Sequence, residues 1–158
     1  MPADPVEFRI VEHLQAALLA ISVAGGYHHD VAAFAVKLDP NHDVESLIGA
    51  TAKRPFAILA LDPDTFSYSP SMMVRIAMPA TVHFVNDSDP TDDASWIEEY
   101  FTLCADVERA VAQDITRGGL AIDTRIVQRE YRSFQGQQVW AQVKLDIGVR
   151  RTYGSPNG

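Results

Sequence analysis

The chain has 158 residues, 47% of them hydrophobic and 22% charged, which suits one folded domain and excludes an intrinsically disordered protein. A single cysteine excludes an internal disulfide, and a formal net charge of −8 argues against generic nucleic-acid binding. No apolar stretch is long enough to span a bilayer and no N-terminal signal peptide is recognisable, so we expect one domain over residues 1–158, made in the cytoplasm without a membrane role.

The first predicted element is an amphipathic helix. Asp4 is expected as its N-cap, with Pro5 at the first helical position, and the glycine pair Gly25-Gly26 as its end. Apolar residues that recur every three or four positions give this helix one buried face, namely Val6, Ile10, Val11, Leu14, Ala17, Leu18 and Ile21.

Two strands are expected next, with an ambiguous segment between them. Residues 31–38 are apolar and β-branched, and Asp39-Pro40-Asn41 should end this strand. Residues 41–53 could form a helical turn or an irregular loop. The wholly apolar run from Phe56 to Leu61 predicts a buried central strand.

The segment that follows contains a turn and a long strand. Residues 62–70 are rich in turn-forming residues and should be exposed. Residues 72–85 alternate roughly between apolar and polar, but Pro79 cannot donate a hydrogen bond to a neighbouring strand. We therefore expect an edge strand, or a strand interrupted by a bulge.

A second long helix is predicted from Asp92-Asp93, whose carboxylates suit the positive end of a helix dipole, to about Asp114. Ile97 and Phe101 lie to one side of its apolar stripe, so Phe101 is a candidate for contact with a partner. The stripe itself consists of Trp96, Tyr100, Leu103, Val107 and Val111.

The last segment, after Arg117-Gly118-Gly119, predicts a long β-hairpin. Every odd position from Val139 to Val149 is apolar, which is the period of a half-buried strand. With a turn at Gln135-Gly136, the tip from residue 131 to residue 140 should project from the domain. The expected register forms apolar, ionic and aromatic pairs at once: Ile122–Val149 and Ile126–Leu145, Arg125–Asp146, and Tyr131–Trp140.

Trp140 is an anomaly because it lies on the polar face of this amphipathic strand. Trp, Tyr and Arg are the residue types that anchor protein interfaces. We therefore predict an interface with another subunit or a partner on the outer face of the hairpin; the alternative is that another part of the same chain covers Trp140. The candidate interface residues are Phe101, Arg125, Arg129, Tyr131, Arg132, Phe134, Trp140 and Lys144.

The charge is divided unevenly along the chain. Up to Thr116 there are 6 basic and 18 acidic residues, and from Arg117 onward 7 basic and 3 acidic, so the net charge changes from −12 to +4. A basic segment of this kind could dock on the acidic part of a neighbouring copy. A solvated surface accounts for the pattern equally well.

The remaining residues do not indicate catalysis. His28-His29-Asp30 is the densest group of possible metal ligands, but neighbouring side chains in an extended segment point in opposite directions, and no zinc or iron spacing is present. Cys104 lies among acidic residues that should raise its pKa, which disfavours a nucleophile. We expect no enzyme activity, metal or cofactor. A small metal-dependent enzyme that uses these three ligands is the alternative of another class.

The order of these elements resembles a known family. The amphipathic helix, the turn from Gly25 to Asp30, the strand after Arg54-Pro55, the acidic helix and the hairpin that ends at Tyr153-Gly154 are similar to the tail terminator, or tail completion, proteins of long-tailed bacteriophages and the neck proteins related to them. The stretch 139–147 is the most family-like, and the resemblance covers residues 6–153.

This resemblance implies an α+β fold in which two principal helices pack on a mainly antiparallel sheet. It further implies a structural protein of the virion tail or neck, which forms a hexameric ring, caps the tail tube, ends tail polymerisation and joins the tail to the head connector. The implied partners are further copies of the chain, the tail tube protein and the connector or stopper protein. Another neck component, such as a stopper or head-completion protein, is the close alternative.

Overall fold

The computed structural model describes residues 3–38, 43–89, 91–152 and 154–155. In chain order the elements are α1 (Val6–Leu19), a 3₁₀ helix η1 (Val23–Gly25), β1 (Ala33–Lys37), α2 (Val44–Ala50), β2 (Phe56–Leu61), β3 (Thr65–Tyr68), β4 (Met73–Asp87), α3 (Asp93–Ala112), β5 (Asp123–Phe134) and β6 (Gln138–Thr152). The strands form one sheet in the order β1-β2-β4-β6-β5, with β3 beside β4. Only the β1–β2 pair is parallel among these pairs, so the expected α+β fold with a mainly antiparallel sheet is confirmed.

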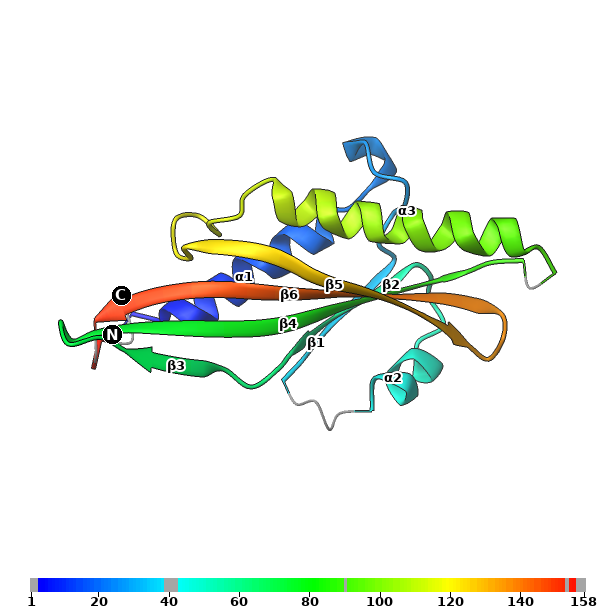
Figure 1. The fold of residues 1–158 in the computed structure, drawn as a ribbon. Coiled ribbons are helices and arrows are strands. Elements are labelled where there is room, and N and C mark those ends of the chain that lie inside the picture. Colours follow the sequence, from blue (N-terminus) through cyan, green and yellow to red (C-terminus); the bar gives the residue numbers. More distant parts are fainter. Residues whose placement is uncertain (1–2, 39–42, 90, 153, 156–158) are drawn as a thin grey trace.

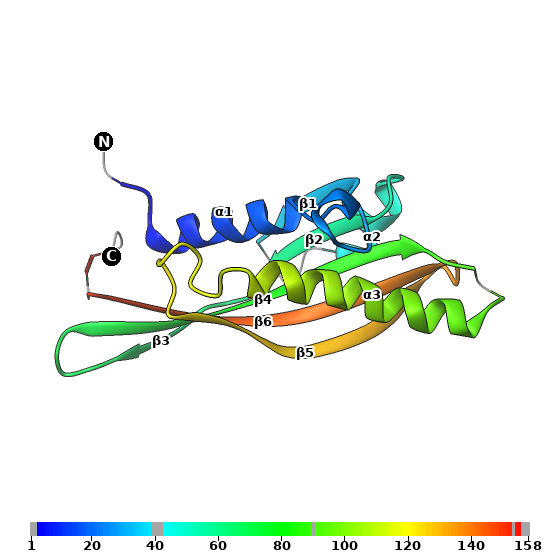
Figure 2. The same cartoon turned by 90° about the horizontal axis from the view of Figure 1, so that it is seen from above.

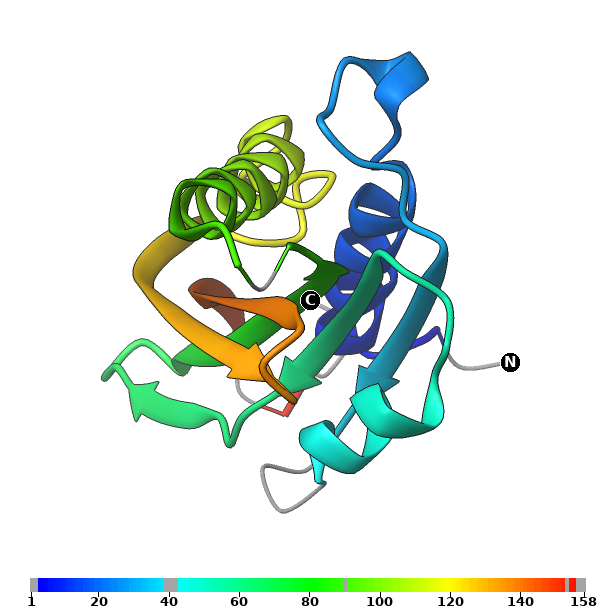
Figure 3. The ribbon, with the colours of Figure 1, turned by 90° about the vertical axis from the view of Figure 1, so that its right-hand side faces the viewer.

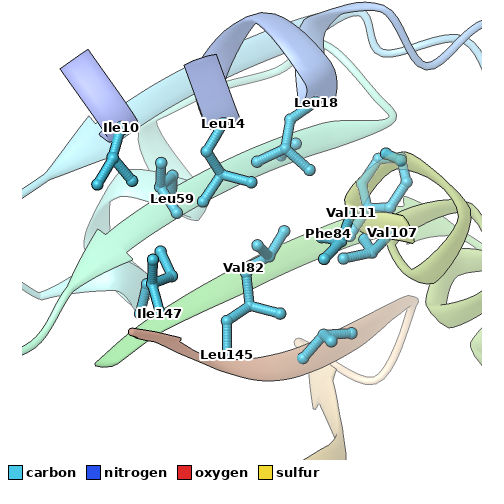
Figure 4. Close-up of a cluster of buried hydrophobic side chains, with 14 of the residues drawn as sticks. Ile10, Leu14, Leu18, Leu59, Val82, Phe84, Val107, Val111, Leu145 and Ile147 are labelled. Atoms are coloured by element: carbon cyan, nitrogen blue, oxygen red, sulfur yellow. The ribbon is translucent and has the colours of Figure 1, made fainter. Parts of the chain in front are cut away.

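The helices lie on both faces of the sheet. The long helices α1 and α3 cover one face and α2 covers the other, as Figures 1 and 3 show. The larger core lies beneath the long helices, where α1 contributes Ile10 and Leu14 and α3 contributes Val107 and Val111 to side chains from β2, β4 and β6 (Figure 4). Val82 and Leu145, on neighbouring strands, are fully buried between them.

A second, smaller core lies between the sheet and α2. It consists of Ile48, Phe56, Ile58, Val85, Phe134 and Trp140. The helical alternative for residues 41–53 is thus realised in α2, whose N-cap Asp43 accepts a hydrogen bond from the backbone N–H of Ser46. The predicted strand end at Asp39-Pro40-Asn41 lies outside the described residues.

Helix α1 is shorter than its sequence pattern predicts. Pro5, not Asp4, occupies the N-cap, and the helix ends at Leu19 rather than at the glycine pair. The chain then folds into η1, where Ser22 accepts a hydrogen bond from the Gly25 N–H and Gly26 adopts a left-handed conformation with φ 86°. Local hydrogen bonds that Ser22 accepts offer the backbone an alternative to the helix, which explains the earlier end.

The prediction of an edge or bulged strand around Pro79 was wrong. β4 runs without interruption between β6 and two other strands, because β3 pairs with it only up to Ala77 and β2 only from Ala80. Pro79 accepts a hydrogen bond from the Asp62 N–H on that side. Its missing N–H therefore falls in the gap between β2 and β3, where no ladder partner is needed. The segment predicted as a turn, 62–70, contains β3.

The hairpin forms as predicted, with one change in register. Ile126 lies opposite Leu145 as expected, but a bulge at Val127 shifts the rest of β5 by one residue. Tyr131 consequently faces Ala141, and Arg132 faces Trp140, so the predicted pair of Tyr131 with Trp140 was wrong. Because strand side chains alternate between faces, the shift moves every side chain after the bulge to the other face of the sheet.

The tip of the hairpin does not project. Gln135 and Gly136 lie in the turn with positive φ values of 52° and 64°, and together with Gln137 they form a three-residue connection, because Phe134 pairs with Gln138. The tip lies against the end of β4, where the Ser88 N–H donates to the Gln137 carbonyl, and Phe134 is buried under α2. The part of the sheet that extends beyond the helices is instead the end formed by β3 and β4 (Figure 2).

Candidate functional site

The bulge at Val127 divides the candidate interface residues between two faces of the sheet. Arg129 and Tyr131 point to the face covered by α3, where Arg129 lies over the ring of Phe101 and Tyr131 lines the same groove as Phe101. The others lie on the face covered by α2: Arg125, Arg132, Phe134, Trp140 and Lys144. The single outer face that the sequence predicts for all of these residues is therefore not formed.

Phe101 and Tyr131 line an open groove between α3 and β5, with a volume of about 700 Å³, and Arg129 lies beside it. We define the aromatic groove as Trp96, Ile97, Tyr100, Phe101 and Tyr131, with Asp93 and Ser133 at its margins. Ile97, Phe101 and Tyr131 are each at least half exposed. The helical period correctly predicted that Ile97 and Phe101 lie away from the core stripe.

The groove is held open by contacts among its aromatic rings. Tyr131 meets Trp96 and Tyr100 edge-on, with ring centroids 6.3 and 5.8 Å apart, which are favourable arrangements for aromatic pairs. Tyr100 and Phe101 are 5.0 Å apart. Arg129 lies 5.8 Å from the centre of the Phe101 ring and pairs with Glu108 at 3.1 Å, so one end of the groove carries a cation.

Trp140 belongs to the interior of its own chain. It is 4% exposed beneath α2, and its indole N–H donates to Nδ1 of His83 at 3.0 Å. The guanidinium of Arg132 lies 5.4 Å from the centre of the indole ring on the open side. The alternative in which the same chain covers Trp140 is the one the structure adopts, and little of this ring is available to a partner.

The other residues on this face are paired within the chain. Arg125 is exposed and pairs at 2.6 Å with Asp123, not with Asp146, although the predicted register brings Asp146 opposite. Lys144 pairs with Glu130 at 3.3 Å. Of the eight candidate residues, the groove therefore collects two, Phe101 and Tyr131, with Arg129 beside it, and Phe134 and Trp140 belong to the smaller core.

The segment His28-His29 forms a polar cluster with α3, which the sequence did not predict. Asp106 is 1% exposed and accepts four hydrogen bonds of 2.8–2.9 Å, two from backbone N–H groups and two from imidazole nitrogens of the histidines. The other ring nitrogen of His29 lies 2.7 Å from Glu99, which also accepts from Asn86 at 2.7 Å. We call Asn86, Glu99, Asp106, His28 and His29 the histidine cluster.

This geometry favours the imidazolium form of His29, because both ring nitrogens face carboxylates. Burial opposes that charge, but the hydrogen bonds and charges of Glu99 and Asp106 outweigh burial and raise the pKa of His29 above 6.5. Burial alone would raise the pKa of Glu99, yet the hydrogen bonds from His29 and Asn86 lower it. His83 behaves oppositely: burial and the nearby Arg132 lower its pKa to about 4.

The combined contribution of His29 and His83 to the free energy of unfolding should therefore be greatest near pH 6.5. A raised folded-state pKa gives His29 a stabilising contribution that is complete below about pH 6.5 and lost above it, with a slope of at most about 1.4 kcal/mol per pH unit. His29→Gln should flatten this alkaline decline. Urea unfolding between pH 6 and 9 measures it, and an unchanged slope in His29→Gln would contradict the assignment.

The pH dependence of stability below pH 6.5 provides a matched control. The lowered pKa of His83 makes the unfolded state bind more protons between about pH 4 and 6.5, so stability falls as the pH decreases through this range. His83→Gln should reduce this acidic decline and leave the alkaline decline unchanged. The reverse pattern would show that the two histidines had been assigned to the wrong ranges.

The three residues of the metal-site alternative do not converge. The ring nitrogens of His29 both face carboxylates, His28 is directed at Asp106, and Asp30 accepts a hydrogen bond from the Val23 N–H. Within the described ranges, no group of three or more His, Cys, Asp or Glu residues is arranged to hold a metal ion. No helix in the described part of the chain is long and apolar enough to cross a membrane.

A signal for Asp106 was present in the sequence. It lies three residues after Leu103 and one before Val107, which places a carboxylate on the buried side of α3. A buried carboxylate needs hydrogen-bond donors. The pattern thus predicts a polar partner somewhere in the fold, although it does not identify the histidines 77 and 78 residues away in sequence.

Comparison with known proteins finds little similarity to this chain. No protein-family model matches it, and no curated protein matches it. One solved structure to which it is similar is a chain described as "Virion of native gene transfer agent (GTA) particle", with a TM-score of 0.39 and 10% sequence identity over 90% of this chain and 98% of that chain. A likeness of this degree establishes neither a shared fold nor a shared function.

Proposed function

We propose that this chain is a non-catalytic structural protein of a phage-like virion, which forms a ring, caps the tail tube, ends tail polymerisation and joins the tail to the head connector. The observation that carries the proposal is the aromatic groove. It exposes large apolar side chains beside a cation and an anion, Arg129 and Asp93, and exposed apolar patches with polar rims mark sites of protein association.

The opposite edge of the sheet offers a different apolar surface. There Phe8 of α1 and Val36 and Leu38, in and just after β1, line a second groove of about 690 Å³ and are all exposed. A chain with two different exposed apolar surfaces can make head-to-tail contacts between copies. Such contacts give a closed ring when the rotation from one copy to the next adds up to a full turn. The resemblance to tail terminator proteins implies six copies in that ring.

Arg129→Glu tests the role of the groove in assembly. Reversing this charge should repel Glu108 and remove the cation over Phe101, so we expect loss of the ring in native mass spectrometry. The protomer should stay folded, because a half-exposed ion pair contributes at most about 1 kcal/mol. Arg9→Glu, the same change on exposed α1, is the control. A ring that survives Arg129→Glu would remove the groove from the proposal.

Electron microscopy of the purified protein mixed with tail tubes tests the assigned position in the virion. A tail terminator should appear as a ring at one end of each tube. A stopper or head-completion protein should leave the tube ends free and associate with connectors instead. Free tube ends in the presence of excess protein would therefore reject capping and favour the other neck components.

A further inference from the structure

The segment from Ser22 to Asp30 forms a loop whose apolar tip stands away from the core. Figures 1 and 3 show η1 raised above both long helices. Val23 is 55% exposed at the tip, next to exposed Ala24 and Gly25. More than half of the Val23 surface is thus left uncovered by its own chain.

This loop is nevertheless fixed to α3 by several specific contacts. Besides the bonds to Asp106, Arg109 donates to the Gly26 carbonyl and lies 5.0 Å from the centre of the Tyr27 ring. Gln113 donates to the Tyr27 hydroxyl at 2.9 Å. Within the loop, Asp30 accepts from the Val23 N–H at 2.8 Å. Ordering a residue costs about 1–2 kcal/mol, so contacts that fix an exposed tip point to a use for its shape.

The fixed tip and the aromatic groove lie on opposite sides of α3. Ile97 of the groove and Asp106 of the histidine cluster are nine residues apart, which at 3.6 residues per turn directs them about 180° away from each other. Figure 3 shows the same arrangement, with β5 on one side of α3 and the raised loop on the other. Unlike surfaces on opposite sides of one helix are what a head-to-tail contact between copies needs.

We propose that the Val23–Ala24 tip of one copy inserts into the aromatic groove of the next copy. The small apolar side chains of the tip would cover Phe101 and Ile97, which are the exposed part of the groove. Asp30 at the base of the loop is exposed and acidic. Arg129 at the rim of the groove pairs with Glu108 at 3.1 Å but remains 41% exposed, and its guanidinium has further N–H donors, so Asp30 of the neighbouring copy would meet a cation there. A loop already fixed in shape loses little entropy on binding. The inference rests on the proposed ring.

A mixing experiment tests this contact. Val23→Asp should destroy the tip and Phe101→Asp the groove, so each variant alone should lose the ring and be monomeric in native mass spectrometry. In an equimolar mixture, the intact tip of Phe101→Asp should bind the intact groove of Val23→Asp, and assembly should stop at heterodimers. Both positions are exposed, so folding should persist; Phe66→Asp, an exposed position of similar accessibility on β3, should keep the ring.

Cross-linking provides a second test that does not depend on loss of assembly. Val23→Cys and Ile97→Cys, made in separate chains and mixed, should form a disulfide between copies under mild oxidation, whereas neither alone should. Cys104 should not compete, because burial raises its pKa to about 11.

The outcomes distinguish a failure of the proposed tip–groove contact from a failure of the proposed ring. Rings that persist in both Asp variants, without the mixed disulfide, would overturn the inference and leave the proposed function standing with another contact. Binding of the tip to tail tubes but not to other copies would also overturn it. A wild-type chain that remains monomeric at all concentrations would contradict the ring and the inference together.

Discussion

Trp140→Ala is expected to lower the free energy of unfolding by about 3–5 kcal/mol, the range for removing a large aromatic side chain from a core. The ring of Trp140 fills the space between β6 and α2, in the cluster that also contains Phe134 and Ile48. Its removal also deprives Nδ1 of His83 of the hydrogen bond that the indole N–H donates. Urea unfolding followed by tryptophan fluorescence from the remaining Trp96, together with circular dichroism, measures the loss.

Two further substitutions separate the packing of Trp140 from its polar contacts. Trp140→Phe keeps most of the apolar volume and removes the donor to His83, so it should cost about 1–3 kcal/mol. Arg132→Ala removes only the guanidinium over the indole ring and should cost about 1 kcal/mol or less. If Trp140→Ala instead unfolds like the wild type but loses the ring, Trp140 is an interface residue after all.

The alternation of apolar and polar residues along β6 was enough to predict the hairpin, the position of its turn and the register near Ile126. It could not reveal the bulge at Val127, because β5 is exposed along most of its length and its sequence carries no alternation that an extra residue would disturb. One inserted residue exchanged the faces of Tyr131 and Arg132. A predicted interface on one face thus became a groove on one side and a buried tryptophan on the other.

Predictions that depended on contacts between distant segments failed for a related reason. The covering of Trp140 depends on α2, a helix of seven residues in a segment whose sequence allowed either a turn or a loop. The exposure of Phe101 was predictable, because the helical period alone separates it from the core stripe. Hydrogen bonds across 77 residues, such as those of His29 to Asp106, depend on the tertiary fold and have no local signature.

Asp106→Ala is expected to lower the free energy of unfolding by about 3–5 kcal/mol, the range for removing one partner of a buried ion pair. The substitution leaves two backbone N–H groups without an acceptor and removes one of the two carboxylates that stabilise charged His29. Since that carboxylate helps to raise the folded-state pKa of His29, the alkaline decline in stability should still begin near pH 6.5 but should be smaller and end at a lower pH. Urea unfolding at several pH values measures both effects.

Glu108→Ala is the matched control for Asp106→Ala, because both replace an acid on the same helix. Glu108 pairs with Arg129 at the surface, where each side chain is about 40% exposed, so its loss should cost at most about 1 kcal/mol and leave the pH dependence unchanged. Burial, rather than charge, then accounts for the difference between the two variants. Equal losses would mean that the carboxylate of Asp106 contributes no more than a surface charge, and that the loop is held by its contacts to Arg109 and Gln113 instead.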